Sequence, residues 1–323
     1  NNVRPNNLYP ATVPIFGKPA PLRGSLYVIK GVYREMKTAH LREGIMQAVF
    51  TACACISILA VVLICVFLFA NGLPTIGKIG PLKFLLGTTW KPGNDIYGIL
   101  PMILGSLYVT AGAIIVGVPV GLLTAIYLSR FSTPAIKRVM LPAVQLLAGI
   151  PSVVYGLVGM TVLVPFVQKT FSLSSGACLL TAILVLTVMI LPYIVSVSET
   201  ALRAVPREYE EASLALGATK AETWFLVSLR AAKSGVIASI IQGTGRAVGE
   251  AMAILMVAGN VANMPSLFAS VRFLTTAIVS EMSYAAYGSL QRDALFSVGL
   301  VLFLFIMLIN AALRLLSERS AKA

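Results

Sequence analysis

The chain carries, between two long apolar runs, the polar segment Glu211-Ala-Ser-Leu-Ala-Leu-Gly217, followed after nine residues by Val227-Ser-Leu229. Pro206 and several acidic residues precede this segment, which is typical of the first turn of a helix because negative side chains interact favourably with the helix dipole. Gly217 is a candidate helix C-cap, since glycine readily adopts the left-handed conformation found there. Residues 218–229 have a second helical pattern. The segment therefore predicts a short helix, a tight glycine turn and another helix.

The composition places the rest of the chain in a lipid bilayer. Hydrophobic residues make up 58% of the sequence, charged residues 11%, and the mean hydropathy is +0.88. A soluble domain has about 25% charged residues, and roughly 20 apolar residues span a membrane. The sequence predicts an all-α polytopic membrane protein with six transmembrane helices. The six apolar runs are 46–70, 98–128, 139–168, 177–198, 235–258 and 294–313.

The distribution of Lys and Arg predicts the orientation in the membrane. If the N-terminus is inside, 18 Lys and Arg residues fall in cytoplasmic segments and six in outside segments. Cytoplasmic loops of membrane proteins are enriched in these residues. We therefore expect both termini to be cytoplasmic. The same distribution accounts for the formal net charge of +13, and no soluble basic module with interleaved aromatic residues suggests nucleic-acid binding.

The sequence divides into four parts. Residues 1–24 contain five prolines and predict an irregular segment. Residues 25–45 predict an amphipathic helix at the inner membrane surface. The transmembrane domain covers 46–316 and includes the polar loop at 199–233, and a cytoplasmic tail covers 317–323. In the outside segment 259–292, apolar residues at helical spacing predict an amphipathic helix that lies at the outer interface or dips into the membrane.

The residues of common active sites are missing from the spans. The four cysteines lie in or beside apolar runs, where Cys acts as a small hydrophobe, and the single histidine, His40, lies before the first span. Asp95 and Asp293 are the two aspartates, and both lie outside the spans, which argues against an intramembrane protease. Gly72–Ile79 matches a phosphate-binding loop except that Ile79 replaces the Ser or Thr needed for Mg²⁺. We expect no catalytic residues, no metal site and no nucleotide site on this chain.

Two charges lie inside the fifth predicted span. Arg246 and Glu250 are four residues apart, so we expect them on one helix face. A charge in the bilayer costs several kcal/mol unless it meets a partner or an aqueous path. Arginine presents a planar fork of donors that suits oxyanions. The pair predicts a substrate pathway to which Thr244 and Ser239 add neutral donors; a purely structural ion pair is the alternative.

The polar loop resembles the "EAA" loop of ABC importer permeases, whose pattern is E-A-A-x3-G-x9-I-x-L-P. It matches at Glu211, Ala212 and Gly217, and approximately at Val227 and Leu229. It departs from the pattern at Ser213, where the family has Ala, and at Arg230, where the family has Pro. The resemblance implies a loop that docks a cytoplasmic ATPase. The ATPase-coupling residues implied are Glu208, Glu211, Ala212, Ser213, Gly217 and Leu229.

Three further stretches resemble the phosphate-specific (Pst) permeases. They are Phe84-Leu-Leu-Gly-Thr-Thr-Trp-Lys-Pro92, Leu146-Leu-Ala-Gly-Ile-Pro-Ser-Val-Val-Tyr-Gly156 and Gly243-Thr-Gly-Arg-Ala-Val-Gly-Glu-Ala251. The first of them is more similar to PstC-type than to PstA-type subunits. The resemblance covers about residues 43–316 and implies the fold of a type I ABC importer permease.

This resemblance also implies a function and partners. It implies a non-enzymatic permease subunit that moves inorganic phosphate across the bacterial inner membrane into the cell. The implied partners are a homologous PstA-type permease in a heterodimer, two cytoplasmic ATPases that hold ATP and Mg²⁺, and an extracytoplasmic phosphate-binding protein. A permease for another oxyanion, such as molybdate or sulfate, is the alternative.

Overall fold

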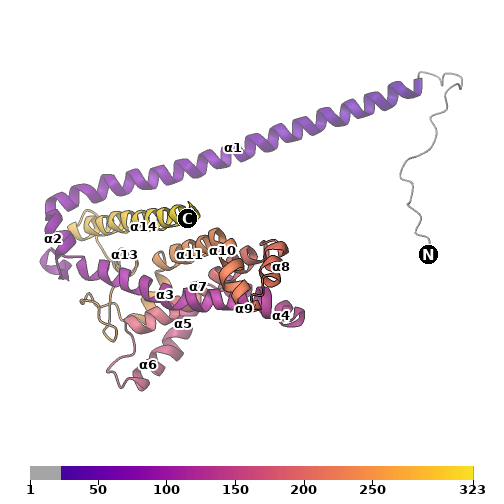
Figure 1. Cartoon of the computed structure of the whole chain (residues 1–323). Coiled ribbons are helices and arrows are strands. Elements are labelled where there is room, and N and C mark those ends of the chain that lie inside the picture. Colours follow the sequence, from indigo (N-terminus) through magenta and orange to yellow (C-terminus); the bar gives the residue numbers. More distant parts are fainter. Residues whose placement is uncertain (1–22, 323) are drawn as a thin grey trace, which may run out of the picture. The chain divides into compact units, whose positions relative to one another are not determined.

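The computed structural model describes residues 23–322, with side chains described for residues 43–315. Residues 1–22, most of the segment that we expected to be irregular, lie outside the described residues. The chain divides between Cys65 and Val66 into two units. The first unit contains the N-terminal part of helix α1 (Arg23–Ile79), and the second contains the rest of the chain (Figure 1).

Helix α1 includes the first predicted span, 46–70. It also includes residues 25–45, but the side chains before Glu43 lie outside those described, so an amphipathic helix at the membrane surface stays a prediction. Side chains such as Phe50, Ile56 and Ile64 are 59–65% exposed. Exposed apolar side chains along a helix of this length are those that lipid would cover.

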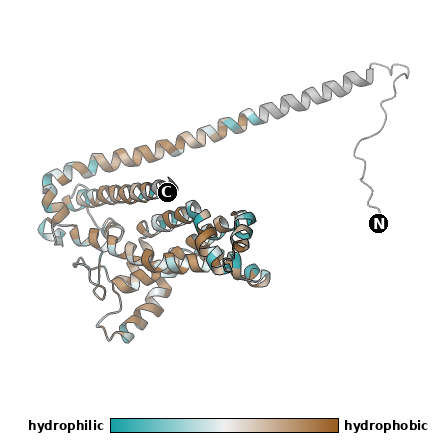
Figure 2. Ribbon diagram, viewed as in Figure 1, coloured by the Kyte–Doolittle hydropathy of each residue, from teal (hydrophilic) through white to brown (hydrophobic). Residues whose placement is uncertain are grey.

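Two long helices form the centre of the second unit. Helix α3 (Leu100–Ile126) continues into the π-helical turn η2 (Tyr127–Phe131), and α7 (Leu179–Arg203) packs along it. Both are apolar over most of their length (Figure 2). Their buried side chains include Val109, Leu186 and Ile190. These helices confirm the predicted spans at 98–128 and 177–198, and α14 (Leu290–Lys322) contains the span at 294–313.

Glycines allow α3 and α7 to approach closely. A Cβ atom added at Gly117 would lie 2.8 Å from Ile190 Cδ1, and one at Gly121 would lie 2.7 Å from Ile194 Cγ2. Both distances are shorter than a van der Waals contact. The small-xxx-small spacing of these glycines therefore serves helix packing, as such spacing commonly does in membranes.

We expect Gly117→Leu to destabilise the bundle, because its side chain would have to displace Ile190. Overpacking of this kind costs about 1–3 kcal/mol. Membrane abundance and the midpoint of thermal unfolding should both fall. Gly245 has no neighbour within 4 Å of an added Cβ atom, so Gly245→Leu is the matched control. Equal thermal stability of the two variants would contradict this packing role.

The third predicted span, 139–168, is not one helix. The chain here forms α4 (Pro134–Gly149), α5 (Ser152–Val158), the π-helical turn η3 (Gly159–Leu163) and α6 (Val164–Thr170). Ile150 is extended, with ψ 129°, because proline disfavours the helical conformation of the residue before it. The segment long enough to cross a membrane is Ser152–Thr170. The prediction was therefore wrong in its N-terminal part.

The fifth predicted span, 235–258, is also broken. Helix α11 (Lys233–Val248) ends at Gly249, and α12 (Met252–Val257) begins after Ala251. Among the described residues, five helical segments are long and apolar enough to cross a membrane, and the number reaches six if the bent pair Lys220–Ala231 and Lys233–Val248 counts as one. The axes of that pair meet at 73°. The all-α polytopic architecture is confirmed.

The polar loop lies at one end of the bundle (Figure 1). Its elements are α8 (Arg207–Ala215), α9 (Lys220–Glu222), the π-helical turn η4 (Thr223–Ser228) and α10 (Leu229–Ala231). Hydrophilic residues are frequent here, in contrast to the long helices (Figure 2). The helix–turn–helix that the sequence predicted is present.

The opposite end of the second unit holds shorter elements. They are α2 (Pro81–Leu86), the antiparallel strands β1 (Trp90–Lys91) and β2 (Ile96–Tyr97) joined by η1 (Pro92–Asn94), and α13 (Leu274–Glu281). We expected an amphipathic helix in 259–292 that lies at the outer interface or dips into the membrane. The helix in this segment is the short α13, whose first four residues are buried, because it packs against α3, α12 and α14.

Candidate functional site: the polar loop and the Arg246–Glu250 pair

Helix α8 starts as its sequence predicts. Pro206 occupies the N-cap position, and Glu208 and Glu210 lie in the first turn. Their charges interact favourably with the unpaired N–H groups at the helix start. Of the predicted coupling residues, Glu208, Glu211, Ala212 and Gly217 are exposed. They are available to a partner.

Gly217 ends α8 in a Schellman motif. Its φ is +88°, in the left-handed region that favours glycine. The N–H of Gly217 donates to the carbonyl of Leu214 at 3.0 Å, and the N–H of Ala218 donates to that of Ser213 at 3.2 Å. These bonds satisfy carbonyls at the helix end. The predicted C-cap is confirmed, and it places Leu216 at the tip with 89% of its side chain exposed.

The second arm begins at Lys220, two residues later than we expected. Thr219 is the N-cap and forms a capping box with Glu222. The Thr219 backbone N–H and hydroxyl both donate to the Glu222 carboxylate, at 2.8 and 2.7 Å, and these bonds lower the pKa of Glu222. The arm then runs through η4 and α10 and bends into α11.

Two of the predicted coupling residues face inward. The Ser213 hydroxyl lies 2.9 Å from that of Thr223, which joins the two arms. Leu229 is half-buried and packs against an apolar cluster that includes Ile126 and Leu202. Ser213 and Leu229 therefore shape the loop, whereas the exposed residues face outward.

Arg130 anchors the base of the polar loop, and our sequence analysis missed it. Its guanidinium lies 2.5 Å from the Glu210 carboxylate and donates to the Leu202 carbonyl at 2.8 Å. Ser228, on the second arm, donates to the same carboxylate at 3.2 Å. Arg130 and Glu210 are 14% and 15% exposed. This contact ties both arms of the loop to the ends of α3 and α7.

An aromatic contact supports the same junction. The rings of Phe131 and Trp224 meet edge to face, with centroids 4.0 Å apart. Nearby, the Lys137 ammonium of α4 pairs with the Glu199 carboxylate of α7, which is only 4% exposed. The loop is therefore held to η2 and α7 by packing and charge together, and the Lys137–Glu199 pair joins α4 to α7 beside it.

We expect Arg130→Gln to loosen the base of the loop, because it leaves the half-buried Glu210 carboxylate without its cation. Loss of a charged hydrogen bond should make chymotrypsin cleavage beside the exposed Tyr209 about tenfold faster. Arg138, exposed on α4, provides the control variant Arg138→Gln. Identical digestion of the two variants would argue against the anchor.

Arg246 and Glu250 lie at the break between α11 and α12, and not on one continuous helix as we expected. The guanidinium and carboxylate are 3.7 Å apart. Glu250 is 5% exposed, and its other carboxylate oxygen accepts from the Ala253 N–H at 3.1 Å. Arg246 is 38% exposed. Its Nε is buried and, among the described residues, has no hydrogen-bond partner.

This geometry gives the two charges different roles. Glu250 is held by the hydrogen bond from the Ala253 N–H of α12 and by its ion pair with Arg246, so its charge is largely satisfied inside the protein. The Arg246 side chain is partly exposed to solvent. It also keeps unused N–H donors, because one ion pair at 3.7 Å occupies little of its capacity of five N–H donors. Arg246 can thus receive an anion while Glu250 orients it.

The two predicted neutral donors are buried and bonded within the protein. The hydroxyls of Ser239 and Ser198 lie 2.8 Å apart, between α11 and α7. The Thr244 hydroxyl donates to the Ile240 carbonyl at 2.8 Å. The structure therefore does not bring them together with Arg246, and their part in a substrate pathway stays a prediction.

Known proteins are similar in sequence to this chain over most of its length. Residues 117–322 match the family described as "Binding-protein-dependent transport system inner membrane component". A probable ABC transporter permease protein, YqgH of Bacillus subtilis, is 39% identical over 89% of this chain and 96% of its own length. The phosphate transport system permease protein PstC of Pasteurella multocida is 35% identical over 74% of this chain and 81% of its own length. The PstC protein of Mesorhizobium japonicum is 31% identical over 86% of this chain and 91% of its own length.

Solved structures share the fold. A chain of the MetNI methionine ABC transporter, in an inward-facing conformation, superposes with a TM-score of 0.53 over 75% of this chain and 98% of its own, at 22% identity. A second crystal form of the same transporter superposes with a TM-score of 0.50 over 69% of this chain and 94% of its own, at 22% identity. This likeness concerns the fold alone.

The apolar helices and the exposed helix–turn–helix define a multi-pass membrane subunit. The chain belongs to the family of binding-protein-dependent transport system inner membrane components. It is accordingly a multi-pass inner-membrane permease, and not the catalytic subunit of its transport system.

Proposed function

We propose that this chain is a PstC-type permease subunit of an ABC importer that moves inorganic phosphate into the cell. The observation that carries the proposal is the exposed helix–turn–helix of Glu211 and Gly217, which continues through a 73° bend into the helix that bears Arg246. The names of the PstC relatives support phosphate as the substrate.

The exposed residues of α8 form the contact with a cytoplasmic ATPase. Two such ATPases hold ATP and Mg²⁺, and this chain holds neither. Closure of the ATPases moves the polar loop, and the bend at Ala232 passes this motion to α11. A rigid connection of this kind lets one part of a bundle switch another between two states.

Arg246 forms the anion contact inside the membrane. Its fork of donors suits a tetrahedral oxyanion, and Glu250 holds it in place from the start of α12. Because Glu250 also neutralises part of the charge, the anion is held weakly enough to leave on the other side. Conduction requires this balance between binding and release.

The remaining partners are those that a binding-protein-dependent ABC importer of this kind requires. A homologous PstA-type permease completes a heterodimer and the second half of the pathway. An extracytoplasmic phosphate-binding protein delivers the anion to the end of the bundle that carries α2 and α13. Both termini of this chain are cytoplasmic, in agreement with the excess of Lys and Arg there.

Reconstitution tests this proposal directly. The permease pair, the ATPases and the binding protein are placed in proteoliposomes with ATP, and uptake of radioactive phosphate is measured. We expect uptake that depends on ATP and that excess unlabelled phosphate suppresses, while sulfate and molybdate do not. Absence of ATP-dependent phosphate uptake, together with ATP-dependent uptake of radioactive sulfate or molybdate by the same proteoliposomes, would contradict the assigned substrate and favour another oxyanion.

A further inference from the structure

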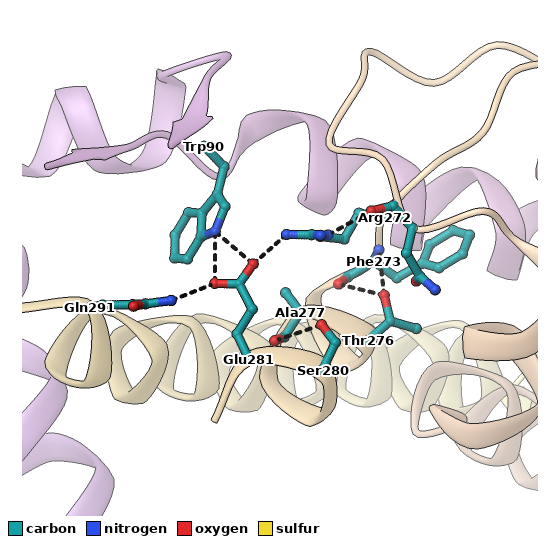
Figure 3. Close-up of polar contacts among 9 residues, drawn as sticks. Trp90, Arg272, Phe273, Thr276, Ala277, Ser280, Glu281 and Gln291 are labelled. Carbon is teal, nitrogen blue, oxygen red and sulfur yellow. Dashed lines mark hydrogen bonds and ion pairs between the residues drawn. The ribbon is translucent and has the colours of Figure 1, made fainter. Parts of the chain in front are cut away.

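Glu281, at the end of α13, contacts three segments, of which the one with Trp90 lies 191 residues away in the sequence (Figure 3). Its carboxylate accepts from the indole Nε1 of Trp90 at 3.0 and 3.1 Å, and from the amide of Gln291 at 3.1 Å. It also pairs with the guanidinium of Arg272, whose Nε donates to the Asn260 carbonyl at 2.9 Å. Glu281 thereby fixes α13 to the β1–β2 hairpin, to the loop before α13 and to α14.

The neighbourhood of Trp90 makes this attachment firm. Trp90 is 7% exposed, and its ring meets that of Tyr97 edge to face with centroids 5.4 Å apart. Burial and the nearby carboxylates of Asp95 and Glu281 raise the pKa of Tyr97 to about 12. Tyr97 therefore stays neutral, and its hydroxyl donates to Asp95 at 3.2 Å.

The other end of α13 contacts the break that carries the candidate anion site. The Thr275 hydroxyl donates to the backbone carbonyl of Glu250 at 2.9 Å. The Leu274 N–H donates to the Ser106 hydroxyl of α3 at 3.1 Å. The start of α13 is capped by Thr276, whose hydroxyl accepts from the Phe273 N–H at 3.0 Å (Figure 3). These groups are buried.

We infer that α13 is a positioning element for the Arg246 site: Thr275 holds the break at Glu250, and Glu281 holds α13 against the outer hairpin. This inference rests on the proposed function for its transport consequence, but the structural linkage stands on the contacts alone. Thr275 and Glu281 act through Glu250, so they are positioning residues and do not touch the anion.

The physical basis is the irregular backbone between α11 and α12. The helix hydrogen bonds become long here, since the N–H groups of Gly249 and Glu250 donate to the Gly245 and Ala247 carbonyls at 3.3 Å, and α12 starts only after Ala251. The position of the break therefore depends also on the bonds that it makes to other elements. Thr275 supplies one, and the Ala253 N–H to Glu250 bond supplies another. Buried hydrogen bonds of this kind fix one arrangement when each is satisfied. A change at the outer hairpin can therefore shift the break by moving α13 as a unit.

Hydrogen exchange in the assembled complex tests the linkage without reference to the substrate. Thr275→Val keeps the shape of the side chain and removes the donor, so amide exchange at residues 249–254 should become about fivefold faster. Thr187→Val is the matched control, because Thr187 is buried in α7 and its hydroxyl bonds only to the Ile183 carbonyl of its own helix. Thr275→Ser retains the hydroxyl and should restore slow exchange.

Glu281 extends the test to the far end of α13. Glu281→Gln removes the ion pair with Arg272, and we expect faster exchange at 249–254 in this variant too. If Glu281 acts through Thr275, the combined variant should exchange little faster than either alone, since residues in one network are not additive. Unchanged exchange at 249–254 in Thr275→Val, or equal acceleration in Thr187→Val, would overturn the inference.

Uptake kinetics then separate this inference from the proposed function. In Thr275→Val we expect the KM for phosphate uptake to rise about fivefold with membrane abundance near that of the wild type, and Thr275→Ser to reverse the change. Failure of the wild-type complex to take up phosphate would refute the substrate alone. A normal KM in Thr275→Val, beside an active wild type, would overturn the positioning role.

Discussion

Gly217→Pro is expected to abolish phosphate uptake while the protein remains inserted in the membrane. Proline holds φ near −65°, whereas Gly217 has a φ of +88°. Proline also lacks the N–H that donates to Leu214. The turn between the two arms cannot form, so the loop no longer presents α8 to the ATPase. Uptake and membrane abundance, measured on the same cells, check this result.

A graded series sharpens the test of the coupling turn. Gly217→Asn should retain much of the uptake, because Asn tolerates the left-handed conformation better than other non-glycine residues. Glu211→Lys should also uncouple the transporter, because it reverses an exposed charge at the ATPase contact. Since Glu211 is exposed on α8, this variant should keep the stability of the wild type. Normal uptake in both Gly217→Pro and Glu211→Lys would refute the coupling role.

Arg246→Gln is expected to abolish uptake in a complex that still assembles and binds its ATPases. Gln cannot supply the charge or the fork of donors that an oxyanion requires. Arg246→Lys keeps the charge without the planar fork, so only part of the activity should remain. Uptake in proteoliposomes and recovery of the intact complex by gel filtration are the two measurements.

The double variant Arg246→Gln with Glu250→Met separates a pathway from a structural ion pair. Replacing a buried pair by neutral residues often leaves stability unchanged or improves it. A purely structural pair would therefore be replaceable, with assembly and transport restored together. We expect the double variant to assemble and still fail to transport. Uptake near the wild-type rate would exclude Arg246 from the pathway.

The sequence predicted those helices whose bounds are marked by neighbouring residues, such as an apolar run, a proline or a glycine. The span of α7 is a long apolar run in which Pro192 does not break the helix, and α8 is bounded by Pro206 and Gly217, so both helices were found from the sequence, although α7 continues to Arg203. Gly217 was predictable because a left-handed residue after a polar helix is most often glycine.

The breaks in the third and fifth spans were not predicted, because hydropathy does not register them. Ile150 and Pro151 are as apolar as their neighbours, so an apolar run passes through the point where the helix ends. Only the effect of proline on the preceding residue marks it. In the fifth span, the spacing of Arg246 and Glu250 suggested one helix face. The backbone at Gly249 ends that helix first.

Contacts between distant residues were beyond the reach of spacing arguments. Arg130 and Glu210 are 80 positions apart, and Trp90 and Glu281 are 191 positions apart. In the sequence, Arg130 is a single Arg after an apolar run and resembles any charge that flanks a membrane span. Only the tertiary fold brings it to α8. The same holds for Thr275, which nothing in the sequence connects with Glu250.

The bend at Ala232 separates two helical arms, Lys220–Ala231 and Lys233–Val248, whose axes meet at 73°. Helix α11 has 16 residues and is therefore about 24 Å long. A rotation of only about ten degrees at the bend would sweep its far end through about 4 Å at that length. Arg246 lies near that far end. In the proposed coupling, a rotation of this size at the bend therefore changes what Arg246 faces at the far end of α11.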